Sequence, residues 1–212
     1  VLVALGVGAR AQTRVWSDSI ALFERMVEVE PTNYFALHCL SAMLAREGRL
    51  EEAEELARRS VAAHPGRGNV EARYNLAILL GRRGESAASD TALREALAVD
   101  PKHTACLEMY VARHPGEARA RWNAALAADA LHPRANHVVG AALLAEGRAQ
   151  DAERHLVRAL ARRMDDPEVF VDLARAYQAQ GRLDEARNCA RQALALRPGH
   201  PRAQSVLGAL GG

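Results

Sequence analysis

"EGRLEEAEELARRSVAAHPG" occupies Glu47–Gly66, and "QGRLDEARNCARQALALRPG" occupies Gln180–Gly199. The two stretches share Gly-Arg-Leu, an acidic pair, an Ala-Arg step and a closing Pro-Gly. The glycines Gly48 and Gly181 are 133 residues apart, so a unit of about 34 residues accounts for both copies. The sequence is therefore built from an internal repeat.

Prolines mark the same period along the chain. They are separated by 34, 36, 32, 34 and 31 residues and stand at Pro31, Pro65, Pro101, Pro133, Pro167 and Pro198. A period in this range is typical of arrays of helical repeats. Aromatic residues make up only 4% of the chain and alanine and leucine are abundant, which favours helices over strands. We therefore predict an all-α fold.

Each unit contains the pattern of two helices. In residues 34–67, Leu37, Leu40 and Leu44 fall on one face of a first helix. Gly48 ends that helix, because glycine readily takes the left-handed conformation of a helix terminus. An acidic pair then opens a second helix, where carboxylates interact favourably with the positive end of the dipole. The unit is therefore a helix hairpin.

Small residues recur at fixed positions in these hairpins. We expect them where two helices cross closely, because a large side chain would hold the helices apart. One column lies in the first helices and two lie in the second: Ser41, Ala77, Gly140, Ala174 and Gly208; Ser19, Ala53, Ser89, Ala118, Ala152 and Ala186; and Ala96, Ala125, Ala159 and Ala193.

These features together resemble the tetratricopeptide repeat (TPR) family. Residues 168–199 match its pattern best, through Phe170, Leu173, Ala174, Tyr177, Gly181, Ala186, Ala193 and Pro198. The resemblance implies a right-handed TPR superhelix, an α solenoid of antiparallel helix hairpins. It covers residues 13–212, as a half repeat at 13–31, repeats at 34–67, 70–101, 102–133, 134–167 and 168–199, and a terminal helix at 201–210.

The repeat at 102–133 departs from the family pattern. Arg113 stands where the turn glycine belongs, and "HPGE" follows it at His114–Glu117. We expect an irregular hairpin there and a local change in superhelical curvature.

The resemblance also implies a non-catalytic protein that binds a protein or peptide partner in its concave groove. First helices line that groove, and arginines on them could contact carboxylates. The candidate groove residues are Phe35, His38, Arg46, Tyr74, Ile78, Arg82, Arg134, His137, Val171, Arg175 and Gln178, within a wider set that includes Ala42, Glu71, Ala141 and Glu168.

Other ligands find less support. The lysine clamp of TPR domains that bind chaperone C-termini has no counterpart, and the column Cys39, Asn75, Val138 and Asp172 is not an asparagine ladder. His137 and His155 could face each other within one hairpin, but no third metal ligand is evident. Four histidines precede proline, where capping or solvation is the default: His64, His114, His132 and His200. We predict no metal, no cofactor and no catalytic site.

Two further interpretations concern the N-terminal segment of the chain. Residues 1–12 begin with apolar Val1–Ala9, which is either the end of a membrane helix or an ordinary buried helix. With Arg14–Asn33, that segment resembles the junction between a polytopic bacterial membrane glycosyltransferase-like protein and its C-terminal TPR tail. The first alternative function is therefore such an accessory tail, membrane-associated through an upstream segment; otherwise a cytoplasmic location is expected.

An RNA-binding helical repeat is the second alternative. It is disfavoured, because 26 acidic residues nearly balance 28 basic ones and leave little net positive charge to attract phosphates.

Overall fold

The computed structural model describes residues 19–66, 69–162 and 165–211. Its contacts divide the chain into two compact units, residues 1–110 and 111–212. Helices are the regular elements of the described ranges, which contain no strand. None of these helices is long and apolar enough to cross a bilayer. The apolar segment at residues 1–9 lies outside the described residues.

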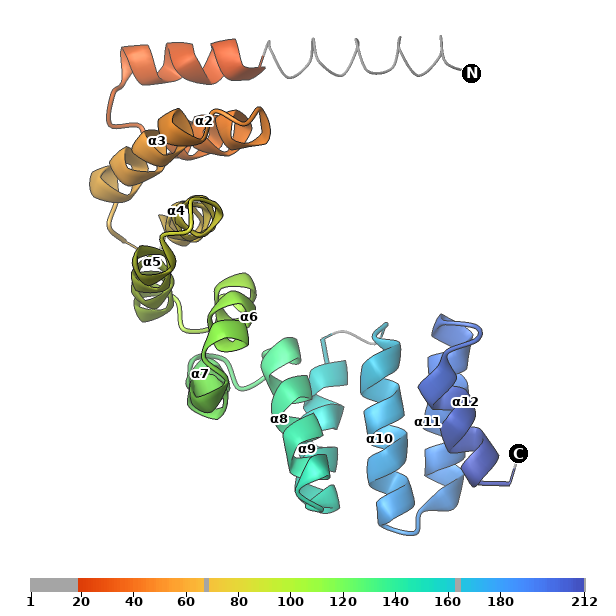
Figure 1. Ribbon diagram of the computed structural model, residues 1–212. Coiled ribbons are helices and arrows are strands. Elements are labelled where there is room, and N and C mark those ends of the chain that lie inside the picture. The colour runs from red at the N-terminus through yellow and green to blue at the C-terminus, as the bar shows by residue number, and fades with distance from the viewer. Residues whose placement is uncertain (1–18, 67–68, 163–164, 212) are drawn as a thin grey trace, which may run out of the picture. The chain divides into compact units, whose positions relative to one another are not determined.

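The first unit consists of stacked hairpins. A helical stretch at residues 19–29 is followed by two hairpins, whose paired helices lie side by side in Figure 1. The helices are α2 (Tyr34–Arg46) with α3 (Leu50–Ala63), α4 (Val70–Arg82) with α5 (Ser86–Val99), and then α6 (Thr104–Arg113), within which the unit boundary falls.

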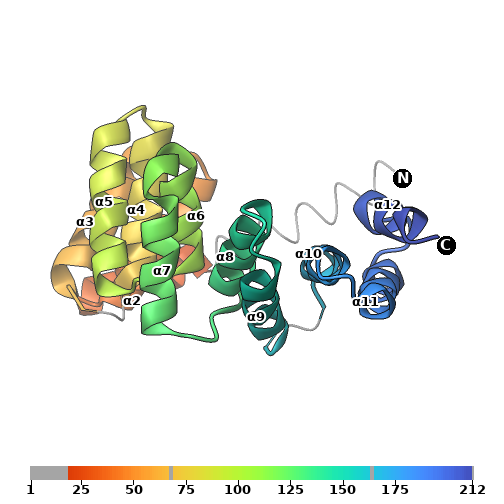
Figure 2. The same cartoon turned by 90° about the horizontal axis from the view of Figure 1, so that it is seen from below.

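The second unit repeats this plan. Figure 2 looks along α10 and α11, which form one hairpin, with α12 beside them. The elements are a 3-10 turn (Pro115–Glu117), α7 (Ala118–Ala128), α8 (Pro133–Ala145), α9 (Ala149–Leu160), α10 (Pro167–Ala179), α11 (Leu183–Leu196) and α12 (Pro201–Ala209).

Local sequence signals fix the ends of these helices. The side chain of Asn33 accepts a hydrogen bond from the Ala36 amide at 3.0 Å, which satisfies a free donor at the start of α2. His132 does the same for α8, since its Nδ1 accepts from the Ala135 amide at 3.1 Å. The turn glycines have positive φ, as the sequence predicted: Gly48 (84°), Gly84 (83°), Gly147 (77°) and Gly181 (75°).

The hairpin around Arg113 is irregular. Within the described ranges no residue other than glycine has positive φ, so Arg113 does not supply the usual left-handed turn. The chain instead extends at His114 (φ −124°) and forms the 3-10 turn Pro115–Glu117. This turn occupies the positions that form the first turn of the second helix in the regular repeats. The expected change in superhelical curvature stays a prediction.

The small-residue columns lie mostly at hairpin crossings. Ala53 and Ala152 are completely buried. Ser41 Oγ donates a hydrogen bond to the Ala53 carbonyl at 2.7 Å, so a side chain of α2 contacts the backbone of α3 directly. A Cβ added to Gly140 would lie 2.8 Å from Leu156 Cγ. Three members of the columns differ: Ser19 and Ala118 are half-buried, and Gly208 is exposed on α12, the last described helix.

Apolar side chains between successive hairpins form the core. One cluster joins the stretch at residues 19–29 to α2, α3 and α4, and in the second unit two clusters join α8 to α10 and α10 to α12. Each repeat therefore buries its apolar face only against its neighbours, as in a solenoid. The prediction of an all-α fold of helix hairpins is confirmed.

Candidate functional site

The first helices carry the predicted groove residues. In the first unit these are on α2 and α4. Phe35 is 54% exposed and packs edge-on against Phe23, with ring centroids 6.2 Å apart. His38 and Tyr74 are half-buried. The wall between α2 and α4 thus offers partly exposed aromatic and imidazole surface.

A groove pocket of about 180 Å³ lies between α2 and α4. Its floor is made of small and aliphatic side chains, among them Ala42 and Ile78, and Arg46 and Arg82 stand at its side. Arg82 makes no hydrogen bond or ion pair with the part of the chain that the structure describes. The pocket is smaller than the ~300–1,000 Å³ of typical cofactor or drug-sized sites. It therefore suits a side chain of a partner rather than a cofactor.

A polar contact joins the two helices at this groove. His38 Nδ1 lies 3.4 Å from the amide nitrogen of Asn75, which also lines the pocket. Burial lowers the pKa of His38, against an opposing effect of the Glu71 charge. The imidazole is therefore neutral at neutral pH, and its Nδ1 can accept the amide proton.

The next contact along the first unit uses Glu71. Its carboxylate lies 2.9 Å from His103 Nε2, in the turn before α6. The ring of Tyr74 tilts against the same imidazole, with centroids 5.7 Å apart. These residues connect α4 to the start of α6.

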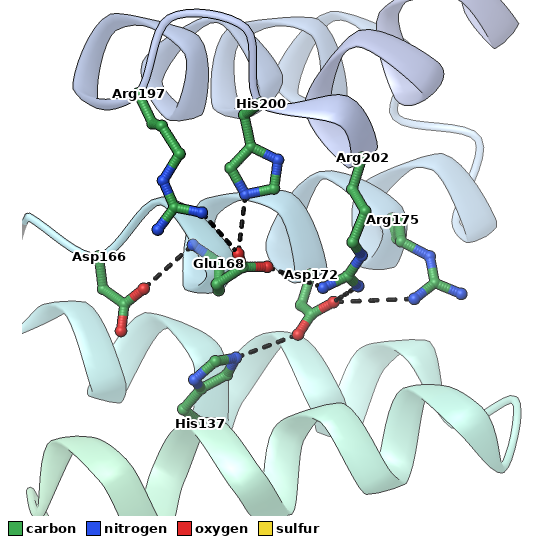
Figure 3. A network of polar contacts seen from close by, with 8 residues as sticks. All are labelled: His137, Asp166, Glu168, Asp172, Arg175, Arg197, His200 and Arg202. Atoms are coloured by element: carbon green, nitrogen blue, oxygen red, sulfur yellow. Dashed lines mark hydrogen bonds and ion pairs between the residues drawn. The ribbon is translucent and has the colours of Figure 1, made fainter.

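In the second unit the corresponding wall is a continuous polar network (Figure 3). Asp172 on α10 lies at its centre and is 5% exposed. His137 Nε2 on α8 donates to Asp172 Oδ2 at 3.1 Å, and Arg202 on α12 donates to Oδ1 at 2.5 Å. Arg175 lies 3.7 Å from the same oxygen. One carboxylate thus joins three first helices.

Glu168 is the second acceptor of this network. It accepts from His200 Nε2 and from Arg202, each at 2.9 Å, and from Arg197 at 3.2 Å (Figure 3). Burial alone would raise the pKa of Glu168, but the hydrogen bond from His200 and the surrounding positive charges outweigh it and lower the pKa. Burial would also raise the pKa of Asp172, but the His137 hydrogen bond and the charge of Arg202 outweigh it and lower the pKa. Both carboxylates are ionised.

Several expectations for this wall are wrong. Val171 is completely buried and belongs to the cluster with Ala203 and Val206, because α12 covers it. His137 is only 8% exposed, because it faces Asp172 rather than the groove. His200 was expected to cap a helix or face solvent, yet it is 2% exposed and bound to Glu168.

The remaining candidates in the second unit stay near the surface. Arg134 and Arg175 are exposed, and Gln178 is half-buried.

Sequence reasoning named the residues that link neighbouring repeats but missed the contacts between them. Asn75 and Asp172 each stand nine residues before a turn glycine, and their histidine partners, His38 and His137, each stand ten residues before one. The sequence therefore contained a signal for both contacts. In each case a histidine ten residues before one turn glycine is followed, in the next repeat, by an asparagine or aspartate nine residues before its turn glycine. Comparing those columns for polarity would have found both contacts.

Side chains that could bind a metal do not cluster in residues 19–66, 69–162 and 165–211. These ranges hold no group of three or more His, Cys, Asp or Glu placed to bind a metal ion. His155 Nδ1 lies 3.0 Å from the side-chain oxygen of Asn136, so His137 and His155 have separate partners. Burial raises the pKa of the Cys106 thiol to about 12, which makes it a poor nucleophile.

Solved structures share this fold at low sequence identity. The chain is similar to pilF of Pseudomonas aeruginosa, with 19% identity, a TM-score of 0.62, and coverage of 84% of this chain and 82% of that one. PilW, described as a type IV pilus biogenesis factor, has 20% identity, a TM-score of 0.57, and coverage of 93% of each chain. YrrB, described as a TPR protein with an unusual peptide-binding site, has 14% identity, a TM-score of 0.57, and coverage of 88% of this chain and 97% of that one. No curated protein matches the sequence.

Sequence profiles identify the family directly. Three profiles, each described as a tetratricopeptide repeat, match residues 36–64, 70–95 and 143–210. Together they cover more than half of the chain, in both units. The chain therefore belongs to the tetratricopeptide repeat family.

Proposed function

We propose that this chain is a non-catalytic interaction scaffold that binds a segment of a partner protein in the groove between α2 and α4. TPR proteins present such grooves to protein or peptide partners. The pocket beside Arg82 is the observation that carries the proposal, because an apolar floor and a guanidinium without a partner among the described residues lie together between α2 and α4.

The chemistry of the groove defines the partner segment. A small apolar side chain fits the floor formed by Ala42, Ala45 and Ile78. A neighbouring carboxylate would pair with Arg82, which can donate two parallel hydrogen bonds. The groove in the first unit is favoured over the wall in the second, where Asp172 and Glu168 already engage the arginines.

Photo-crosslinking in the cells that make the protein tests this proposal. The crosslinking amino acid p-benzoylphenylalanine replaces Phe35, an exposed aromatic residue on the groove wall. We expect a discrete crosslinked product whose yield falls about tenfold or more when Arg82→Glu is added, since charge reversal at a contacting arginine repels a carboxylate.

The control carries the same crosslinker at Glu55, an exposed position on the second helix α3. It should give no such product. Equal products from both positions, or a Phe35 product that Arg82→Glu leaves unchanged, would overturn the proposal. Thermal unfolding of the Arg82→Glu variant separates lost binding from lost folding.

A further inference from the structure

The second unit contains a cavity that opens between α7, α8 and α9. It has a volume of about 640 Å³. Trp122 of α7 and Val138, Val139 and Leu143 of α8 provide its apolar lining. This volume lies within the ~300–1,000 Å³ range of ligand-binding pockets.

The irregular hairpin borders this cavity. Ala142 on α8 and Ala176 on α10 each stand five residues before a turn glycine, so they occupy the same repeat position. Ala176 is completely buried under the preceding hairpin, whereas Ala142 is half-buried and lines the cavity. The 3-10 turn Pro115–Glu117, which replaces the first turn of a second helix, lies at the edge of the cavity, where Pro115 is part of the lining.

Positive charge predominates around the opening. Four arginines and two carboxylates line it: Arg119, Arg148, Arg154, Arg158, Glu146 and Asp151. The carboxylates are already paired: Glu146 contacts Arg119, and Asp151 contacts Arg148 at 2.6 Å and the more exposed Arg154 at 3.4 Å. Arg158 makes no hydrogen bond or ion pair with residues that the structure describes.

The charge of Arg158 acts on the neighbouring histidine. Burial lowers the pKa of His155, and the charge of Arg158 lowers it further, against Asp151. The opening therefore has positive charge that the protein does not neutralise, above an apolar floor.

We propose that this cavity is a second binding site, which takes an acidic segment of a partner protein with an apolar side chain next to its carboxylates. The apolar side chain packs on Trp122 and Val139, and the carboxylates pair with Arg154 and Arg158. Complementary charge supports this occupant, since a basic or neutral segment would leave Arg158 without a partner. The site is separate from the groove beside Arg82, so it stands or falls independently of the proposed function.

A displayed library of random twelve-residue peptides provides the probe. Selection uses the full chain, and peptides that also bind the Arg154→Glu/Arg158→Glu variant are removed. We expect the remaining peptides to be acidic with at least one large apolar residue, and to bind the double variant about tenfold or more weakly. Arg191→Glu, an exposed arginine on α11, is the matched control and should bind as the wild type does.

A site-specific signal identifies where the peptides bind. The chain has two tryptophans, so Trp16→Phe leaves the Trp122 indole as the single reporter. The selected peptides should shift the Trp122 indole N–H resonance and should bind Arg82→Glu undiminished. Circular dichroism of the double variant confirms that its helices persist.

Three outcomes would overturn the inference. Selection could yield no acidic, apolar peptides; the selected peptides could bind without shifting the Trp122 signal; or a single-stranded RNA oligonucleotide could shift that signal as strongly as they do. The last result would indicate a general polyanion site instead.

Discussion

The first-helix walls of the two units use the same repeat positions differently. In the first unit, the neutral Asn75 faces His38, and Arg46 and Arg82 line an open pocket. In the second unit, Asp172 takes the position of Asn75, faces His137 and gathers arginines from α10 and α12.

The difference shows how the charge of one residue changes the contacts made along a first-helix wall. A buried carboxylate must be paired and hydrogen-bonded, so Asp172 takes Arg202 and Arg175 as partners. The half-buried amide of Asn75 needs no counter-charge, so it does not attract the arginines of the first unit. In the second unit, Asp172 therefore makes charged contacts with α8 and α12, whereas the contact of Asn75 with α2 joins two neutral groups.

The largest loss of stability should be similar in the two units, and the smaller losses predicted below are compared with it. Ala53→Leu and Ala152→Leu both place a large side chain at a completely buried helix crossing. Each should lower the free energy of unfolding of its unit by about 2–3 kcal/mol, because overpacking forces the helices apart. Hydrogen exchange followed by mass spectrometry measures each unit separately. A tolerated leucine in either unit would mean that its hairpins do not cross at these alanines.

The next prediction separates the units. Asp172→Ala leaves the buried Nε2 of His137 without its acceptor, which should cost the second unit about 1–3 kcal/mol. Asn75→Ala is the matched change in the first unit and should cost about 1 kcal/mol or less, since the His38 contact is longer, at 3.4 Å. Urea unfolding followed by Trp122 fluorescence, in the Trp16→Phe background, measures the second unit, and hydrogen exchange measures the first. Equal losses would show that the charge of Asp172 brings no extra stability.

Much of the fold followed from the sequence for a physical reason. Turn glycines and small crossing residues are local requirements of each hairpin, so Gly48, Gly181 and Ala152 could be interpreted one position at a time. The groove residues were harder, because their exposure depends on the neighbouring repeat. Val171 occupies a wall position, yet α12 buries it, and only the contact of two repeats decides that.

Acid should weaken the second unit through the same network. The pKa values of Asp172 and Glu168 are lowered on folding, so their contribution is complete above their unfolded values of about 4. It is lost as the pH falls below about 4, through the folded pKa values. The urea midpoint reported by Trp122 should therefore fall between pH 5 and pH 3, and it should fall less in Asp172→Asn. An equal fall in both proteins would contradict a role for Asp172.

The smallest expected effect comes from the outer edge of the network. Arg202 contacts both Asp172 and Glu168, but 47% of its side chain is exposed, so solvent screens its charge. Arg202→Gln should therefore cost the second unit less than about 1 kcal/mol, although Arg202 makes the shortest contact to Asp172 in Figure 3. A double-mutant cycle with Asp172→Asn, measured by urea unfolding, isolates the pair. A loss of about 2 kcal/mol or more would show that Arg202, rather than His137, is the main partner of Asp172, since a weakly screened ion pair would then stabilise the link between α10 and α12.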